Sequence, residues 1–173
     1  MNWKDRIQQE RKEKDRFLGK HPRSPIPGEE RENFDGLDYF PVKEKFRFEL
    51  ELHEHDEKQS QVIGTSTGGE REYTRWGEFR FELGGEEHVL QAYRSDPDEE
   101  RLWIPFKDET NGEETYGMGR YLDLEDKENG KWVLDFNQAY NPFCAYSENY
   151  ECALIPQENH LDARIEAGEK AYH

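Results

Sequence analysis

The chain has 173 residues and a formal net charge of −16, and only 32% of its residues are hydrophobic, although 13% are aromatic. This length predicts one folded unit, and the aromatic side chains, each of which can bury a large area, argue against a disordered chain. The negative charge disfavours nucleic acid and anionic membranes as partners, and it is compatible with positively charged ligands or metal ions.

Apolar stretches are short throughout the chain. None approaches the roughly 20 residues that span a membrane, and residues 1–18 are charged and lack an apolar signal core. We therefore expect a cytoplasmic protein with no membrane partner. The acidity is typical of halophilic proteins and also of ordinary acidic cytosolic proteins, and the sequence leaves both sources and the oligomeric state open.

The N-terminal part of the chain is predicted to be a helix followed by an extended arm. Trp3, Ile7 and Leu18 form a thin apolar stripe within residues 2–18, where almost all other side chains are polar or charged. Residues 24–27 contain two prolines, and a residue that precedes proline avoids the helical region. The helix is therefore expected to end before this segment.

From residue 46 onward the apolar residues alternate with polar ones, which is typical of half-buried strands. Gly84-Gly85 and Asn129-Gly130 are favourable for two-residue hairpin turns. The predicted strands are residues 46–52, 61–63, 76–83, 89–93, 102–106, 116–124, 132–136 and 161–165. We expect a mainly β fold, an antiparallel barrel or sandwich of short strands, with residues 1–45 as helix and arm and residues 46–173 as the β domain.

Several motifs in the second half of the chain resemble those of a known family. They are Pro105-Phe-Lys-Asp108, Thr110-Asn-Gly112, Gly119-Arg-Tyr-Leu-Asp123, Asp135-Phe-Asn137, Ala139-Tyr-Asn-Pro142, Cys144-Ala-Tyr146 and Ala167-Gly-Glu-Lys170. With these motifs the chain resembles the domain-of-unknown-function 1684 family of bacteria and archaea. The resemblance implies a shared fold and the location of a site, but it implies no reaction.

Polar residues around the Asn129-Gly130 turn suggest a ligand site. If the strands that flank this turn are antiparallel partners, Arg120 and Asn137 lie near the same open end of the sheet. The following loop would then return over that end, and a buried Arg120 would need a carboxylate partner, either Asp135 or Glu158. The candidate ligand-binding residues are Arg120, Tyr116, Asp135, Asn137, Tyr140, Asn141, Tyr146 and Glu158.

The two cysteines, Cys144 and Cys152, allow several interpretations. With His160 they could hold a metal ion, they could form a disulfide, or Cys144 could act as a nucleophile with His160 as its base. Because no basic group in this acidic segment would lower a thiol pKa, we expect two buried, inert thiols that lie close together.

Three functions remain open from the sequence. The first is a small-ligand-binding β-barrel module with a polar site at one end, and it needs no cofactor. The second is an enzyme or metal-binding protein that uses Cys144, Cys152 and His160. The third is a structural or interaction domain without a ligand. A buried polar pocket would favour the first of these over the third.

Overall fold

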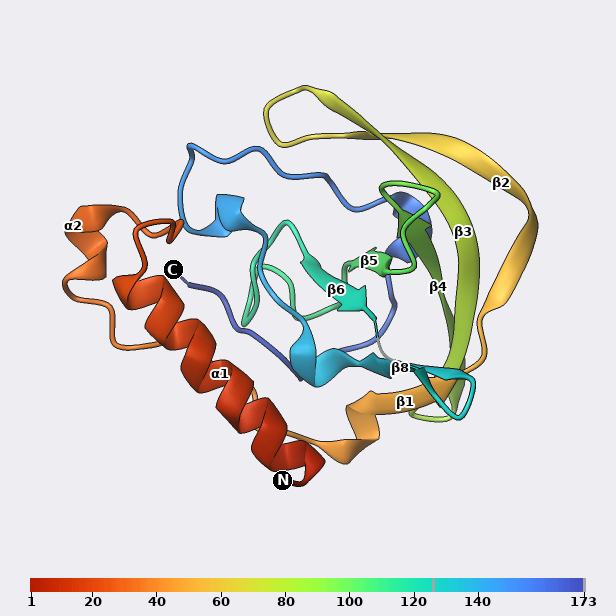
Figure 1. Cartoon of the computed structure of the whole chain (residues 1–173), viewed down its shortest axis with the longest axis horizontal. Coiled ribbons are helices and arrows are strands. Elements are labelled where there is room, and N and C mark those ends of the chain that lie inside the picture. The colour runs from red at the N-terminus through yellow and green to blue at the C-terminus, as the bar shows by residue number, and fades with distance from the viewer. Residues whose placement is uncertain (126, 173) are drawn as a thin grey trace.

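The computed structural model describes residues 1–125 and 127–172 (Figure 1). The predicted N-terminal helix is α1, Trp3–Lys20, and the side chain of Asn2 caps it by accepting a hydrogen bond from the Asp5 amide at 2.9 Å. One further α-helical turn, α2, spans Gly28–Arg31. Four short 3₁₀ helices complete the helical structure: η1 Glu44–Phe46, η2 Phe136–Gln138, η3 Phe143–Ala145 and η4 Gln157–Asn159. No helix among the described residues is both long and apolar enough to cross a membrane.

The strands of the described residues form two antiparallel sheets. The larger sheet has the order β2-β3-β4-β5-β6, and the smaller one has the order β1-β8-β7. Their strands are β1 Arg47–Leu50, β2 His53–Gly64, β3 Glu70–Leu83, β4 Glu86–Arg94, β5 Leu102–Phe106, β6 Arg120–Leu124, β7 Lys127–Glu128 and β8 Lys131–Asp135. The mainly antiparallel fold is confirmed. The described residues form two open sheets in a sandwich-like arrangement, so the barrel alternative is wrong.

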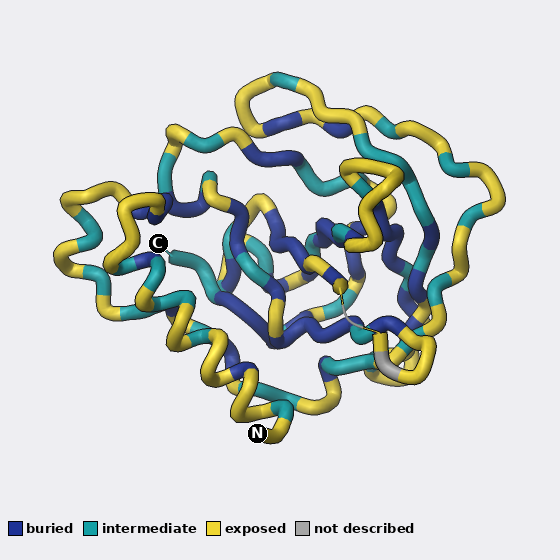
Figure 2. The backbone as a smooth tube through the Cα atoms, in the orientation of Figure 1, coloured by how far each residue is buried: buried dark blue, intermediate teal, exposed yellow. Residues whose placement is uncertain are grey.

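An aromatic-rich core lies between these elements. Figure 2 shows the buried segments gathered in the middle of the molecule, while much of α1 and of the long β2–β3 hairpin is exposed. Phe106 and Phe136 are both fully enclosed, with ring centroids 5.3 Å apart in an edge-on contact. A second, smaller cluster forms where Leu18 of α1 meets Ile26 and Tyr146. The aromatic residues therefore supply a core that the low aliphatic content alone would not provide.

Both predicted two-residue turns are present, but one of the pairings inferred from them is wrong. Gly84 and Gly85 have φ angles of 62° and 83° and join β3 to β4. The turn at Asn129-Gly130 joins β8 only to the two-residue strand β7, while β6 pairs with β5 in the other sheet. A tight turn determines the pairing of the residues next to it, and β8 forms its longer ladder with β1.

Two other strand predictions need correction. The strand expected at residues 61–63 is part of β2, which begins at His53. Residues 161–165 form no strand, although Leu161 and Ile165 are buried as expected. The Leu161 amide donates to the Lys107 carbonyl at 2.8 Å. At the other end of the segment the Ile165 amide donates to the carboxylate of Asp108, and the Ile165 carbonyl accepts from Arg120.

Candidate functional site

A buried carboxylate near the end of the chain organises the candidate site. The side chain of Glu169 is only 4% exposed, and it accepts hydrogen bonds from the Asn141 amide at 2.9 Å and the Tyr146 hydroxyl at 3.2 Å. Its other oxygen pairs with the ammonium of Lys14 on α1. A buried charge is tolerated when it is paired and hydrogen-bonded. Glu169 therefore fastens both α1 and the segment at 139–146 to the C-terminal segment.

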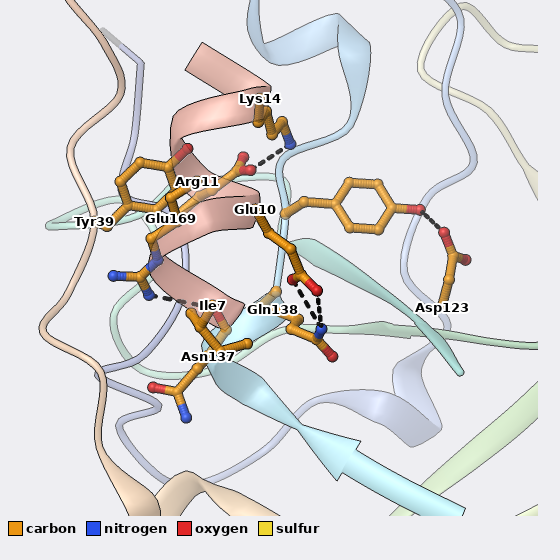
Figure 3. Close-up of a pocket in the computed structure, with 11 residues that line it drawn as sticks. Ile7, Glu10, Arg11, Lys14, Tyr39, Asp123, Asn137, Gln138 and Glu169 are labelled. Carbon is orange, nitrogen blue, oxygen red and sulfur yellow. Dashed lines mark hydrogen bonds and ion pairs between the residues drawn. The ribbon is translucent and has the colours of Figure 1, made fainter. Parts of the chain in front are cut away.

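A pocket of about 290 Å³ opens beside Glu169, between α1 and residues 137–140 (Figure 3). We call it the α1 pocket. The residues that line it are Ile7, Glu10, Arg11, Lys14, Tyr39, Asp123, Asn137, Gln138, Ala139, Tyr140 and Glu169. Ligand pockets usually measure ~300–1,000 Å³, so this one suits a molecule of few atoms.

The wall contributed by α1 was missed by the sequence analysis, although its signal was available. Ile7, Glu10, Arg11 and Lys14 follow the i, i+3, i+4, i+7 spacing that places side chains on one helix face. The guanidinium of Arg11 donates to the carbonyls of Phe40 at 2.9 Å and Asn137 at 3.3 Å, and burial lowers its pKa. Three charged residues, Glu10, Arg11 and Lys14, thus lie on the helix face that apolar residues alone had defined.

Two exposed carboxylates, those of Glu10 and Asp123, complete the lining. Glu10 accepts a hydrogen bond from the Gln138 amide at 3.0 Å, and Asp123 accepts one from the Tyr140 hydroxyl at 2.7 Å. Figure 3 marks both contacts with dashed lines. Neither carboxylate forms an ion pair with any described residue. Burial and the neighbouring Asp123 raise the pKa of Tyr140, so its hydroxyl remains a donor.

Four of the eight predicted site residues meet at this pocket. Asn137 and Tyr140 line it, and Asn141 and Tyr146 contact Glu169 on its inner side. The side-chain amide of Asn141 donates to the Lys170 carbonyl at 3.0 Å. The structure therefore gathers these residues around a carboxylate that the sequence analysis had not selected.

Asp135 and Asn137 mainly brace the chain next to the pocket. Asp135 accepts from the indole nitrogen of Trp3 at 2.8 Å and from the Asn137 amide at 2.9 Å. The side chain of Asn137 bonds to both the amide and the carbonyl of Lys43. These contacts join the start of α1 and the entry to β1 to the end of β8, which is the local backbone bonding that Asp and Asn favour.

Arg120 is buried and paired, but with a different carboxylate from either expected one. Its guanidinium lies 3.4 Å from Asp108, and it also donates to the carbonyls of Ile165, Ala167 and Glu169. Neither Asp135 nor Glu158 contacts it. Burial lowers the pKa of Arg120, and the nearby carboxylate of Asp108 acts in the opposite direction. The side chain is fully enclosed and does not line the α1 pocket.

Glu158 and Tyr116 lie in other surroundings. Glu158 pairs with Arg75 at 3.3 Å and accepts from the Tyr93 hydroxyl, so its bonds go to β3 and β4. Tyr116 instead donates a hydrogen bond to the sulfur of Cys144 at 3.5 Å.

The two cysteines are close together and both are free thiols. The backbone nitrogen of Cys144 donates to the sulfur of Cys152 at 3.2 Å. Cys144 is half-buried, so the expectation of two buried thiols is wrong for it, while Cys152 is 8% exposed. No group of three or more His, Cys, Asp or Glu side chains within residues 1–125 and 127–172 is arranged to hold a metal ion, and this covers the set with His160.

Comparisons with known proteins place this geometry in a family. A solution NMR structure of an uncharacterised protein from Haloarcula marismortui is 39% identical and superposes with a TM-score of 0.75, over 97% of this chain and 94% of that chain. No curated protein matches the chain. The family model described as a protein of unknown function (DUF1684) matches residues 32–170. The match covers most of the chain, which therefore belongs to the DUF1684 family.

Proposed function

We propose that this protein is a small-molecule-binding module and that the α1 pocket takes a small organic amine. The proposal rests on the hydrogen bonding of the carboxylates of Glu10 and Asp123. Both carboxylates line the pocket, and both are hydrogen-bonded only to neutral donors. A positively charged group that entered the pocket would give these carboxylates an ion-pair partner, which neither has among the described residues.

The other charged groups of the pocket are already engaged. Lys14 neutralises the buried Glu169, and two N–H groups of Arg11 are occupied by backbone carbonyls. The guanidinium of Arg11 also lies over the ring of Tyr39, 4.6 Å from its centroid. The lining thus contains one more carboxylate than cation, which favours a cationic ligand over an anionic one.

The aromatic wall and the overall charge support the same ligand class. An ammonium group is attracted to the face of an aromatic ring, and Tyr140 lines the pocket next to Asp123. Lys14 already places its own ammonium 5.2 Å from the centre of the Tyr140 ring, which shows that this environment accepts a positive charge. The net charge of −16 also raises the local concentration of cations around the protein.

The test is a titration of isotope-labelled protein with butylammonium and, separately, with butanoate, followed by amide chemical shifts. We expect butylammonium to shift the amides of residues 137–140 and of the adjacent face of α1, and we expect added salt to weaken the binding. Glu10→Gln and Asp123→Asn should each weaken it severalfold. Glu87→Gln, at an exposed carboxylate of the β3–β4 hairpin, removes the same charge outside the pocket and should leave the affinity unchanged.

The two probes separate the ligand class from the function itself. Tighter binding of butanoate than of butylammonium would overturn the amine assignment. If neither probe shifts the residues of the α1 pocket at any concentration, the small-molecule function is wrong for this pocket, and the structural role becomes the better explanation.

A further inference from the structure

The backbone of Cys144 contacts the sulfur of Cys152, eight residues further along the same loop. Cys144 lies in η3, and its backbone nitrogen is 3.2 Å from the sulfur of Cys152. Three covalent bonds separate that nitrogen from the sulfur of Cys144, so rotation of one side chain and a small movement of the loop bring the sulfurs together. A disulfide requires this kind of proximity, with Cβ atoms about 3.5–4.5 Å apart.

The surroundings of the two sulfurs differ in a way that assigns them different roles. Cys144 is half-buried and next to Phe143, which is 41% exposed, so a small solute can reach it. Cys152 is enclosed, and its backbone is fixed by Ser66, because its amide donates to the Ser66 hydroxyl at 3.1 Å and its carbonyl accepts from the Ser66 amide at 2.9 Å. Cys144 is thus the accessible thiol and Cys152 the anchored one.

Hydrogen bonding also prepares Cys144 as the nucleophile. The Cys152 thiol and the Tyr116 hydroxyl lower the pKa of Cys144 to about 6, although burial opposes the shift. The pKa of Cys152 is raised, because it shares its proton with Cys144 and is buried. Basic groups are not needed to lower a thiol pKa, because two neutral donors produce the effect here.

We propose that Cys144 and Cys152 form a peroxide-oxidised, reversible disulfide site, with hydrogen peroxide or a small organic hydroperoxide as the oxidant. The thiolate of Cys144 attacks one peroxide oxygen, the O–O bond breaks, and the leaving oxygen takes a proton and departs as water or an alcohol. Cys144 is then a sulfenic acid. The sulfur of Cys152 attacks the sulfur of Cys144, the S–O bond breaks, and hydroxide leaves with the thiol proton as water. The two thiols lose two electrons in total, and the peroxide gains them.

This site is independent of the α1 pocket, so its test does not depend on any ligand. Reduced protein is treated with hydrogen peroxide, blocked with N-ethylmaleimide, and measured as intact protein and as peptides. We expect the mass to fall by two hydrogen atoms, both maleimide additions to disappear, and dithiothreitol to restore them. Peptide masses separate this change from oxidation of Met1 and Met118, the two methionines of the chain.

Two single variants distinguish the roles of the cysteines. In Cys152→Ala the sulfenic acid of Cys144 should accumulate and be trapped by dimedone, because no second thiol consumes it. In Cys144→Ala the remaining Cys152 should react about tenfold more slowly, because it is enclosed. Equal dimedone trapping in the two variants would overturn the assignment of roles.

Three results with the unmodified chain would overturn the site itself. They are a sulfinic or sulfonic acid at Cys144 without a disulfide, a disulfide that forms only in denaturant, and a disulfide that joins two chains. The first two would mean that the folded loop keeps the sulfurs apart, and the third would mean that the oxidised partner is another molecule.

Discussion

Arg120 and Asp108 form an ion pair with 3.4 Å between nitrogen and oxygen, and neither side chain has any exposed surface. Asp108 also accepts hydrogen bonds from the Thr110 hydroxyl at 2.7 Å and from the Ile165 amide at 2.8 Å. Arg120 bonds in addition to the carbonyl of Glu169 at 3.2 Å. The pair therefore joins β6, the turn after β5 and the C-terminal segment.

Replacing Arg120 by Met should destabilise the protein strongly. The substitution leaves the buried carboxylate of Asp108 without its cation and leaves three backbone carbonyls without their donor. Removal of one partner of a buried pair costs on the order of 3–5 kcal/mol. Urea unfolding followed by circular dichroism would measure the loss of unfolding free energy. A variant that does not fold at all would also be consistent with strong destabilisation.

Arg164 provides the matched control, because it is exposed and pairs with Glu113 and Glu114 at the surface. Water and salt screen these pairs, so Arg164→Met should leave the unfolding midpoint almost unchanged. If both variants unfold at the same urea concentration, Arg120 does not have the structural role assigned to it.

Gly168 is expected to tolerate no side chain. Its φ is +82°, and a Cβ atom would lie 2.8 Å from the Cβ of Ala139 and 2.8 Å from the carbonyl oxygen of Phe136. Gly85 has nearly the same φ of +83°, but its surroundings are open. Gly85→Ala should therefore cost only the left-handed backbone strain of ~1–2 kcal/mol, and Gly168→Ala should cost a further ~1–3 kcal/mol for overpacking.

Thermal or urea unfolding of the two glycine variants isolates the effect of space, since φ is nearly the same at both positions. Equal losses of stability would show that the contact between Gly168 and residues 136–139 is loose, contrary to the geometry described above.

The docking of α1 depends on the ion pair between Lys14 and Glu169. Lys14→Met keeps the length of the side chain but leaves a carboxylate with 4% exposure without its cation, which should cost on the order of 1–3 kcal/mol. Lys12→Met, on the exposed face of the same helix, should change the stability by less than about 0.5 kcal/mol. The difference in unfolding free energy between Lys14→Met and Lys12→Met, measured in urea, gives the contribution of the Lys14–Glu169 pair. Equal unfolding free energies would mean that Glu169 does not stabilise the docking of α1.

Local chemistry in the sequence was sufficient to predict most elements but not how they pair. Asn129-Gly130 predicted its turn correctly because positive φ angles at both positions are a property of the two residues themselves. That β8 pairs with β1, more than 80 residues away, depends on packing between distant segments. The alternation at residues 161–165 correctly placed Leu161 and Ile165 in the core. The backbone of Ile165, however, bonds to the side chains of Asp108 and Arg120 and not to a neighbouring strand.

The candidate site was predicted in part for a similar reason. Tyr140 and Asn141 stood out because polar and aromatic residues cluster in one loop of a charged chain. Glu169 and Lys14 did not stand out, since in a chain with 40 acidic and 24 basic residues neither charge is unusual by itself. Only the fold shows that the carboxylate of Glu169 is enclosed and that Lys14 of α1 pairs with it.

The reactivity of Cys144 should depend on pH in a way that reports its hydrogen bonds. The thiolate is the nucleophile, and the pKa of Cys144 is lowered to about 6, compared with ~8.5 for a free thiol. Alkylation of Cys144 by iodoacetamide should therefore rise through a midpoint near pH 6. Tyr116→Phe removes one donor to the thiolate, which destabilises the charged form, raises the pKa and moves the midpoint to higher pH. Cys152→Ala removes the larger contribution to the lowered pKa and should move the midpoint to still higher pH.

Peptide masses assign the alkylation rates to each cysteine. A midpoint near pH 8.5 in the unmodified chain would show that neither donor acts on the thiolate.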